Sequence, residues 1–433
     1  MKALFSFLLF MLSALGFGQT NVSGAISSDT TWSLSNSPYT VTGNVLVASD
    51  VTLTIEAGVT VKVNSGLYIK NEGVLTAVGT SSNKITFESS EESPAKSDWS
   101  GIRIRPTGGS AIDGSQNYSS GSQFKYVVIK HADIGLYIYD AGLHVSYTEF
   151  DTNKYGIEIR KTDGVVIDNS TFTGNSAGIW SEYEDYTSDD YVGAISNTFI
   201  MNSSFSENSN GIDLIMNQRD FINLNITKNI FTENNIGIDF GGGGYGPRVH
   251  SVLISENIVY NSTSYGVNLN RVYGQGTGTS LDYPLEFTKN IVLNNARGSL
   301  MFEYSPSVKF KIHKNILVSN TADVNCIASI GSPSTSNHLF DNNTIISKGK
   351  NVYFGGSSSY HANNISFTNN LFSNSSTNEI IDVKYGSGHV FNNNNLINPS
   401  SAGYFLKNQT ANSIDAENNY WGTVIESEIQ DLI

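Results

Sequence analysis

The 433-residue chain has little cysteine, little proline and few charged residues. Its one cysteine, Cys326, cannot form a disulfide within the chain, and its neighbours Val324 and Ile327 favour a buried structural thiol. No Cys/His spacing of the kind that binds zinc occurs in the sequence. The shortage of cysteine therefore excludes an internal disulfide framework and a zinc-thiolate site.

Charged residues make up 15% of the chain, with 25 Lys and Arg against 39 Asp and Glu and a formal net charge of −14. Without a basic cluster, the chain lacks the face that nucleic acid or an anionic membrane demands. The charge also disfavours a polyanionic glycan unless a cation such as Ca²⁺ intervenes. Few charges combined with 22 Tyr, 22 Phe and 39% hydrophobic residues are typical of an all-β protein with a continuous core.

The N-terminus has the pattern of a secretory signal peptide. Lys2 supplies a positive start, residues 3–17 are apolar, and Gly18 is a small residue placed for cleavage before Gln19. The apolar stretch is too short to span a bilayer, so no transmembrane segment is expected. We therefore predict a signal peptide over 1–18 and a protein that is secreted, either extracellular or on the cell surface.

One phrase recurs from about Phe124 onward: an alternating apolar triplet, an Asn, two apolar residues, another Asn, and a Gly that begins an alternating strand. It reads LNITKNIFTENNIGIDF at 224–240 and LEFTKNIVLNNARGSLMF at 285–302. Ser203, Ser170 and Thr148 occupy the slot of the first Asn upstream. That Asn itself recurs at Asn229, Asn257, Asn290, Asn315, Asn343, Asn370, Asn394 and Asn419.

A period of roughly 25 residues with three short strands predicts a right-handed parallel β-helix solenoid, in which each coil buries its apolar face only against its neighbours. The recurrent Asn should form a hydrogen-bonded ladder and occupy a left-handed bend, and the recurrent Gly should mark another corner. We predict an N-terminal β cap and first coils over 19–123 and repeats over 124–422. A short C-terminal capping helix over 423–433 should place Ile425, Ile429, Leu432 and Ile433 on the open core.

Two stretches carry a family resemblance: NVLVASDVTLTIEAGVTVKV at 44–63, with KITF and WSGIRI after it, and the Asn-Asn-Tyr-Trp-Gly sequence at 418–422. In these the chain resembles bacterial secreted right-handed parallel β-helix repeat proteins, the superfamily that includes pectate lyases and polygalacturonases. The resemblance implies the fold and a carbohydrate-related role. The polygalacturonase motifs Asn-Thr-Asp, Gly-His-Gly and Arg-Ile-Lys are absent in that order.

Long insertions repeatedly follow the Gly-initiated strand, and insertions at one phase of a solenoid protrude from one edge, where such proteins bind. Alternation makes Asp213 and Asp239 outward-facing residues of neighbouring coils, with carboxylates roughly 5 Å apart. Such a pair shares a proton or holds a hard cation. The catalytic candidates are Asp213, Asp239, Arg248 and His250, and the possible Ca²⁺ ligands are Asp213, Asp239, Asp189 and Asp190.

Aromatic, acidic and basic side chains on the same edge suit a sugar polymer. The expected ligand-binding residues are Tyr137, Glu158, Arg160, Trp180, Tyr183, Tyr245, Arg271 and Tyr273. The leading hypothesis is a monomeric, non-catalytic protein that binds a polysaccharide or cell-surface glycan along this edge, with no cofactor beyond a possible Ca²⁺. A polysaccharide lyase or glycoside hydrolase, and an adhesin-like structural rod, remain alternatives.

Overall fold

The computed structural model describes residues 19–181, 193–215, 220–242, 248–274, 283–303, 308–330, 337–356, 361–374, 379–397 and 404–427. The signal peptide predicted over 1–18 lies outside these ranges. No helix among the described residues is long and apolar enough to cross a membrane.

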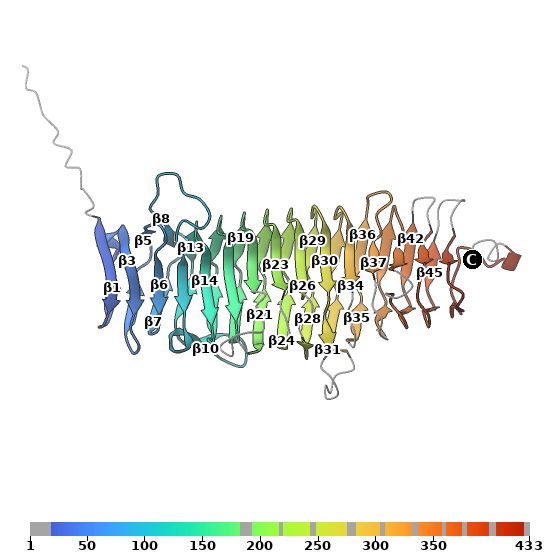
Figure 1. The fold of residues 1–433 in the computed structure, drawn as a ribbon, viewed down its shortest axis with the longest axis horizontal. Helices are drawn as coiled ribbons and strands as arrows, with labels where there is room; N and C mark the ends of the chain where they lie inside the picture. The colour runs from blue at the N-terminus through green and yellow to red at the C-terminus, as the bar shows by residue number, and fades with distance from the viewer. Residues whose placement is uncertain are drawn as a thin grey trace, which may run out of the picture.

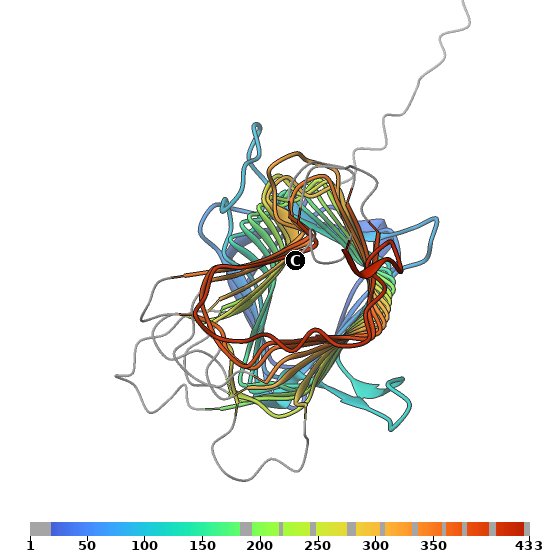
Figure 2. The same cartoon turned by 90° about the vertical axis from the view of Figure 1, so that its right-hand side faces the viewer.

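The strands stack side by side along one long axis, from the N-terminal strands at one end to the C-terminal strands at the other (Figure 1). Seen down that axis, the coils lie over one another around a common core (Figure 2). Neighbouring coils pair in parallel throughout the described stack. The predicted all-β, right-handed parallel β-helix solenoid is confirmed.

Each regular coil contributes three strands, which form three sheet faces; we number them in chain order within a coil. Face 1 contains the apolar triplet and begins the coil. Its strands are β2 (Thr30–Trp32), β4 (Thr52–Ile55), β7 (Val74–Val78), β12 (Gln123–Lys125), β15 (Leu143–Ser146), β18 (Asp163–Asp168), β21 (Ile195–Met201), β24 (Asp220–Thr227), β28 (Val252–Ser255), β32 (Leu285–Thr288), β35 (Phe310–His313), β38 (Leu339–Asp341), β41 (Ser366–Thr368) and β44 (Val390–Asn392), with the short β27 (Arg248–Val249) and β31 (Tyr273–Gly274) at one edge.

Face 2 follows the first Asn of each repeat. Its strands are β5 (Thr60–Val63), β8 (Ile85–Ser89), β13 (Val127–Lys130), β16 (Glu149–Asp151), β19 (Thr171–Thr173), β22 (Ser204–Ser206), β25 (Ile230–Thr232), β29 (Ile258–Tyr260), β33 (Ile291–Leu293), β36 (Ile316–Ser319), β39 (Thr344–Ser347), β42 (Leu371–Asn374) and β45 (Asn395–Ile397).

Face 3 contains the Gly-initiated strand. Its strands are β6 (Tyr68–Asn71), β9 (Gly101–Ile104), β14 (Ile134–Tyr139), β17 (Tyr155–Arg160), β20 (Ala177–Ser181), β23 (Asn210–Ile215), β26 (Ile236–Gly241), β30 (Tyr265–Asn270), β34 (Gly298–Glu303), β37 (Ile327–Ile330), β40 (Val352–Gly355), β43 (Ile381–Val383) and β46 (Leu406–Asn408).

The N-terminal end departs from this regular pattern. The long strands β1 (Thr20–Ile26) and β3 (Tyr39–Val47) pair with each other, and β3 then pairs with both β5 and β6, so it joins faces 2 and 3. Two single 3₁₀ turns, Leu34–Asn36 and Pro106–Gly108, lie between strands. Strands β10 (Ser110–Ile112) and β11 (Tyr118–Gly121) form an antiparallel hairpin that projects from the stack (Figure 2).

The core is built from like residues stacked coil on coil. The rings of Phe150, Phe172, Phe205 and Phe231 stack in one column with centroids 4.8, 4.6 and 4.7 Å apart. These spacings match the distance between neighbouring strands of a sheet, so each ring packs directly on the next. The Cys326 thiol is buried, as the sequence predicted.

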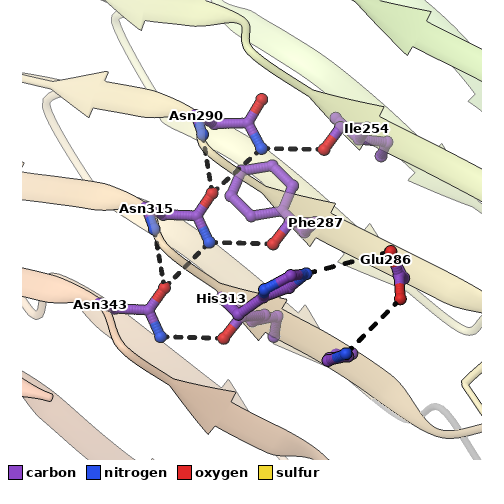
Figure 3. A network of polar contacts seen from close by, with 9 residues as sticks. Ile254, Glu286, Phe287, Asn290, His313, Asn315 and Asn343 are labelled. Carbon is purple, nitrogen blue, oxygen red and sulfur yellow. Dashed lines mark hydrogen bonds and ion pairs between the residues drawn. The ribbon is translucent and has the colours of Figure 1, made fainter. Parts of the chain in front are cut away.

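The predicted Asn ladder is present, and Figure 3 shows three of its members; the ladder is buried from Asn229 to Asn394 and partly exposed at Asn419. The backbone N–H and the side-chain Nδ2 of Asn290 both donate to Asn315 Oδ1, at 2.8 and 3.1 Å, and Asn290 Nδ2 also donates to the Ile254 carbonyl at 2.9 Å. Upstream, hydroxyls take over the acceptor role: the Ser170 N–H donates to Ser203 Oγ at 3.1 Å. Each ladder residue thus satisfies the backbone of an adjacent coil in the dry core.

The ladder Asn is not itself the left-handed residue, and that prediction was wrong. Positive φ is found at the residue immediately before it, for example 58° at Lys228, 56° at Lys289 and 58° at Lys314. The preceding residue turns the chain, and the Asn that follows can then direct its amide into the core, where its hydrogen bonds are made.

The recurrent Gly is not a corner either. Gly211 is the second residue of β23, and a Cβ there would lie 2.5 Å from the Gly237 carbonyl oxygen and 2.7 Å from Phe231 Cδ1. The same collision with the next coil is found at Gly156 and Gly178. Glycine is required because the backbones and the Phe column approach too closely for any side chain.

At the C-terminus, the described residues end at 427 with Glu426 and Ser427 in helical conformation, so the predicted capping helix is not seen as a complete element among them. Ile425, which was expected to help plug the core, is half exposed. Residues 428–433, with the other three predicted plug residues, lie outside the described ranges.

Candidate functional site

Face 3 presents one outward row in strict register along the solenoid. Trp180 pairs with Asp213, Asp213 with Asp239, and Asp239 with Asn268, each one coil from the next. The predicted adjacency of Asp213 and Asp239 is therefore observed, with their strands roughly 4.8 Å apart. We call Asp213 and Asp239 the carboxylate pair.

Each carboxylate is held by a neighbouring amide. Asn210 Nδ2 donates to Asp213 Oδ2 at 2.8 Å, and Asn268 Nδ2 donates to Asp239 Oδ1 at 2.9 Å. Asp213 Oδ1 is buried and has no hydrogen-bond partner among the described residues. A buried oxygen in that condition costs free energy unless a proton or a ligand hydroxyl satisfies it.

Burial keeps protons on the pair. Desolvation, the larger cause, and the charge of Asp213 together raise the pKa of Asp239 to about 7, while the hydrogen bond from Asn268 opposes the shift. Desolvation also raises the pKa of Asp213, against the hydrogen bond from Asn210. Near neutral pH, the pair can therefore hold one proton and one negative charge, which is the state suited to proton transfer.

An aromatic stack borders the carboxylate pair. The indole of Trp180 lies parallel to the ring of Tyr155, with centroids 3.8 Å apart and an interplanar angle of 11°. Burial is the main cause that raises the pKa of the Tyr155 hydroxyl, and the charge of Asp213 contributes, which places this ring within electrostatic reach of the pair. Stacking fixes both rings, and a fixed aromatic surface beside acceptors suits a sugar ring.

Three other residues predicted to bind ligand form a cluster. Glu158 and Arg160 lie one coil before Trp180, and Tyr137 lies two coils before it. Arg160 Nε donates to Glu158 Oε1, and the Glu158 side chain is fully buried. The Arg160 guanidinium also lies 5.3 Å from the Tyr137 ring centroid, as Arg105 does at 5.4 Å. Tyr137 and Glu158 stand in the same outward row as Trp180, since Tyr137 pairs with Glu158 and Glu158 with Trp180, whereas Arg160 pairs with Tyr139 in the neighbouring outward row.

Arg248 and His250 lie elsewhere, at the edge of face 1. Arg248 Nε and Nη2 donate to Asp220 Oδ1 and Oδ2 at 2.6 and 3.1 Å, and His250 Nε2 lies 3.3 Å from Asp220 Oδ1. The structure places them around Asp220, a residue that sequence reasoning missed, and not on the face 3 row. A bidentate Arg–carboxylate pair of this kind is a structural contact in its own right.

Several predicted residues fall outside what the structure describes. These are Tyr183, Asp189, Asp190 and Tyr245, together with the side chain of Tyr273, whose backbone pairs with that of Arg248. Arg271 turns the chain with a φ of 53°. Among the described residues no group of three or more His, Cys, Asp or Glu could hold a metal ion, so the predicted Ca²⁺ site has only the carboxylate pair within that part of the chain.

Sequence reasoning also left Tyr155 and Asn210 out of the site. Both directly precede the recurrent Gly, three residues before Glu158 and Asp213. Alternation counted back from the acids leads to Gly156 and Gly211, so the period of two could not have identified Tyr155 and Asn210. Their shared place directly before the recurrent Gly was the only sequence signal.

Comparisons with known proteins agree with the architecture. Residues 24–139 match the model of the pectate-lyase like beta helix domain. A search of curated proteins finds no match. Among solved structures, the periplasmic alginate epimerase AlgG is 11% identical with a TM-score of 0.50, covering 92% of this chain and 85% of that chain. The Azotobacter vinelandii mannuronan C-5 epimerase AlgE4 A-module is 12% identical with a TM-score of 0.43, covering 86% of this chain and 87% of that chain.

At such low identity the likeness to AlgG shows the fold alone. The repeated coils, their parallel register and the matched N-terminal segment all point the same way. The chain is a parallel β-helix repeat protein whose N-terminal coils are similar to the pectate-lyase-like β-helix domain.

Proposed function

We propose that this is a secreted protein that binds a carbohydrate polymer along the outward row of face 3, centred on the carboxylate pair and the Tyr155–Trp180 stack. The observation that carries the proposal is the buried Asp213 Oδ1, which has no partner among the described residues although it lies on an outward row. A sugar hydroxyl donates to such an oxygen, and the apolar face of a sugar ring packs on a fixed aromatic ring.

The solenoid supplies the length that a polymer requires. The row from Tyr137 to Asn268 crosses consecutive coils at roughly 4.8 Å each, so successive sugar units would meet successive coils. The structural similarity to AlgG, which is an alginate epimerase, supports a polysaccharide as the class of ligand. The match of the N-terminal coils to the pectate-lyase-like domain supports the same class. Extracellular or cell-surface location is part of the proposal.

Affinity electrophoresis in gels that contain neutral or acidic polysaccharides, with and without Ca²⁺, tests the binding. We expect a polysaccharide to retard the protein, and Trp180→Ala and Asp213→Asn each to weaken that retardation at least tenfold. Tyr147→Ala is the matched control, because Tyr147 is also an exposed ring stacked on a tyrosine, Tyr126, at 4.8 Å but lies off face 3. If no polysaccharide retards the protein, the binding proposal fails and the alternative of an adhesin-like structural rod is favoured.

Catalysis on the bound polymer is the second candidate, and the raised pKa of Asp239 favours it. A carboxyl with a pKa of about 7 beside a second carboxylate can give and take a proton near neutral pH. New reducing ends would indicate a glycoside hydrolase, and an increase in the absorbance of unsaturated uronates would indicate a lyase. Loss of that activity in Asp239→Asn would establish the catalytic role. Retention without product in the same samples would support a purely binding protein.

A further inference from the structure

Face 2 carries a row of exposed aliphatic side chains on its outer surface. In the recurring Asn-Ile-apolar sequence, only one of the two apolar residues can point into the core of a strand, and the isoleucine points out. The exposed fractions of Ile230, Ile258 and Ile316 are 43%, 36% and 41%. The row stands in register over four coils: Ile230, Ile258, Ile291 and Ile316.

A second apolar row runs beside it, two residues further along each strand. Its members pair from coil to coil in the same way: Tyr260, Leu293, Val318 and Ile346. Together the two rows make one surface from β25 to β39, which we call the apolar strip; beyond it the second row passes through the polar Ser373 before Ile397 on β45, which is 44% exposed.

Charge is excluded from this part of face 2. None of the described face 2 strands from β19 to β45 contains Asp, Glu, Lys or Arg, although the protein has a formal net charge of −14. The earlier strands of the same face do contain such residues, including Lys62, Glu88, Lys130 and Glu149. Depletion of charged residues is the compositional mark of a protein interface, and a contiguous exposed apolar surface marks a binding site.

We propose that the apolar strip is a self-association surface on which a second copy of this chain packs, face 2 against face 2. A second copy presents the same side chains at the same spacing of roughly 4.8 Å, so the rows of two copies can interdigitate as in packed β-sheets. Two copies with like net charge repel one another most weakly across a face that carries none. The sequence predicted a monomer, and the strip leads to the opposite expectation.

The size of the strip limits the strength of this dimer. From β25 to β39 it extends about 19 Å along the axis and about 10 Å across three residues, or about 190 Å² per copy. Stable interfaces bury about 800 Å² per partner, so a dimer held by this strip is weak and dissociates on dilution. The carboxylate pair stays open in it, because face 3 is a separate face, and the dimer would present two glycan-binding faces.

Sedimentation velocity of the full mature chain over a range of concentrations tests the proposal. We expect the weight-average mass to rise toward that of a dimer, and the Ile258→Lys, Ile316→Lys double variant to weaken association at least tenfold. Ile222→Lys is the matched control, since Ile222 is 39% exposed but belongs to β24 on face 1. Circular dichroism verifies that each variant is folded.

Salt provides a second, independent measurement. Added salt screens the repulsion between two copies that each carry −14 but removes no ion pair from an uncharged interface, so it should strengthen the dimer. A wild-type protein that stays monomeric at its highest concentration would overturn the proposal. So would a dimer that salt dissociates, or one that the control variant weakens as much as the double variant.

Discussion

In the wild-type protein, the free energy of unfolding should decrease as the pH rises toward neutral because Asp239 loses its proton. The Asp239→Asn variant should lack this decrease. The folded protein holds this carboxyl at a pKa of about 7, raised from 3.8 by burial and by Asp213. A raised folded-state pKa stabilises the native protein below the unfolded pKa, and that stabilisation disappears as the pH rises through the folded pKa. Asn is isosteric, and its Oδ1 can still accept from Asn268.

The magnitude follows from these two pKa values. With 3.8 for the unfolded chain and about 7 for the folded one, proton linkage lowers the free energy of unfolding by about 2–3 kcal/mol between about pH 5 and pH 8. The variant lacks this titration. The difference in unfolding free energy, variant minus wild type, should therefore increase by about 2–3 kcal/mol across that range.

Urea unfolding followed by circular dichroism at several pH values measures this difference. Asp50→Asn is the control, because it removes the same charge at an exposed turn with a φ of 62°, which Asn tolerates. A flat difference for Asp239→Asn between pH 5 and pH 8 would refute the buried, proton-sharing description of the pair. An equal slope in the control would refute its assignment to this site.

Two further replacements test the stacking. Gly211→Ala should destabilise the protein by about 2 kcal/mol or more, because the new Cβ meets the next coil at 2.5 Å; Gly114→Ala, with open space around it, should leave the thermal midpoint unchanged. Asn315→Ala should cost about 3 kcal/mol, because it removes the ladder bonds to Asn290 and the Phe287 carbonyl, whereas Ala at the exposed Asn235 should cost well under 1 kcal/mol; urea midpoints distinguish the two.

Periodicity carried most of what the sequence could predict. The repeat and its alternation placed Asp213 next to Asp239 before any coordinates, since residues at equal phase in neighbouring coils must pair. The same alternation held the signal for the apolar strip, because two consecutive apolar residues in a strand cannot both face the core.

The two wrong predictions concern the recurrent Asn and Gly, whose backbone conformation does not follow from residue type alone. Asn and Gly both tolerate left-handed conformations, so turns were the natural prediction for them. In the fold, Lys228 adopts the left-handed conformation of the turn, and Asn229 forms the hydrogen bonds of the ladder. Position 211 requires glycine because a Cβ there would collide with the next coil. Nor could composition reveal the pKa of Asp239, because that depends on how deeply the folded chain buries it.

The hydrogen bonds of the Asn ladder all run in one direction. The protein can therefore become longer or shorter only by complete coils. Every acceptor oxygen serves the coil before it, so Asn290 depends on Asn315 and Asn315 on Asn343. Removing one complete coil leaves each remaining amide facing an identical neighbour, whereas removing half a coil breaks both the ladder and the Phe column. Gain or loss of genetic segments would therefore be tolerated in units of one turn, and the reach of the binding face could change during evolution without redesign of the core.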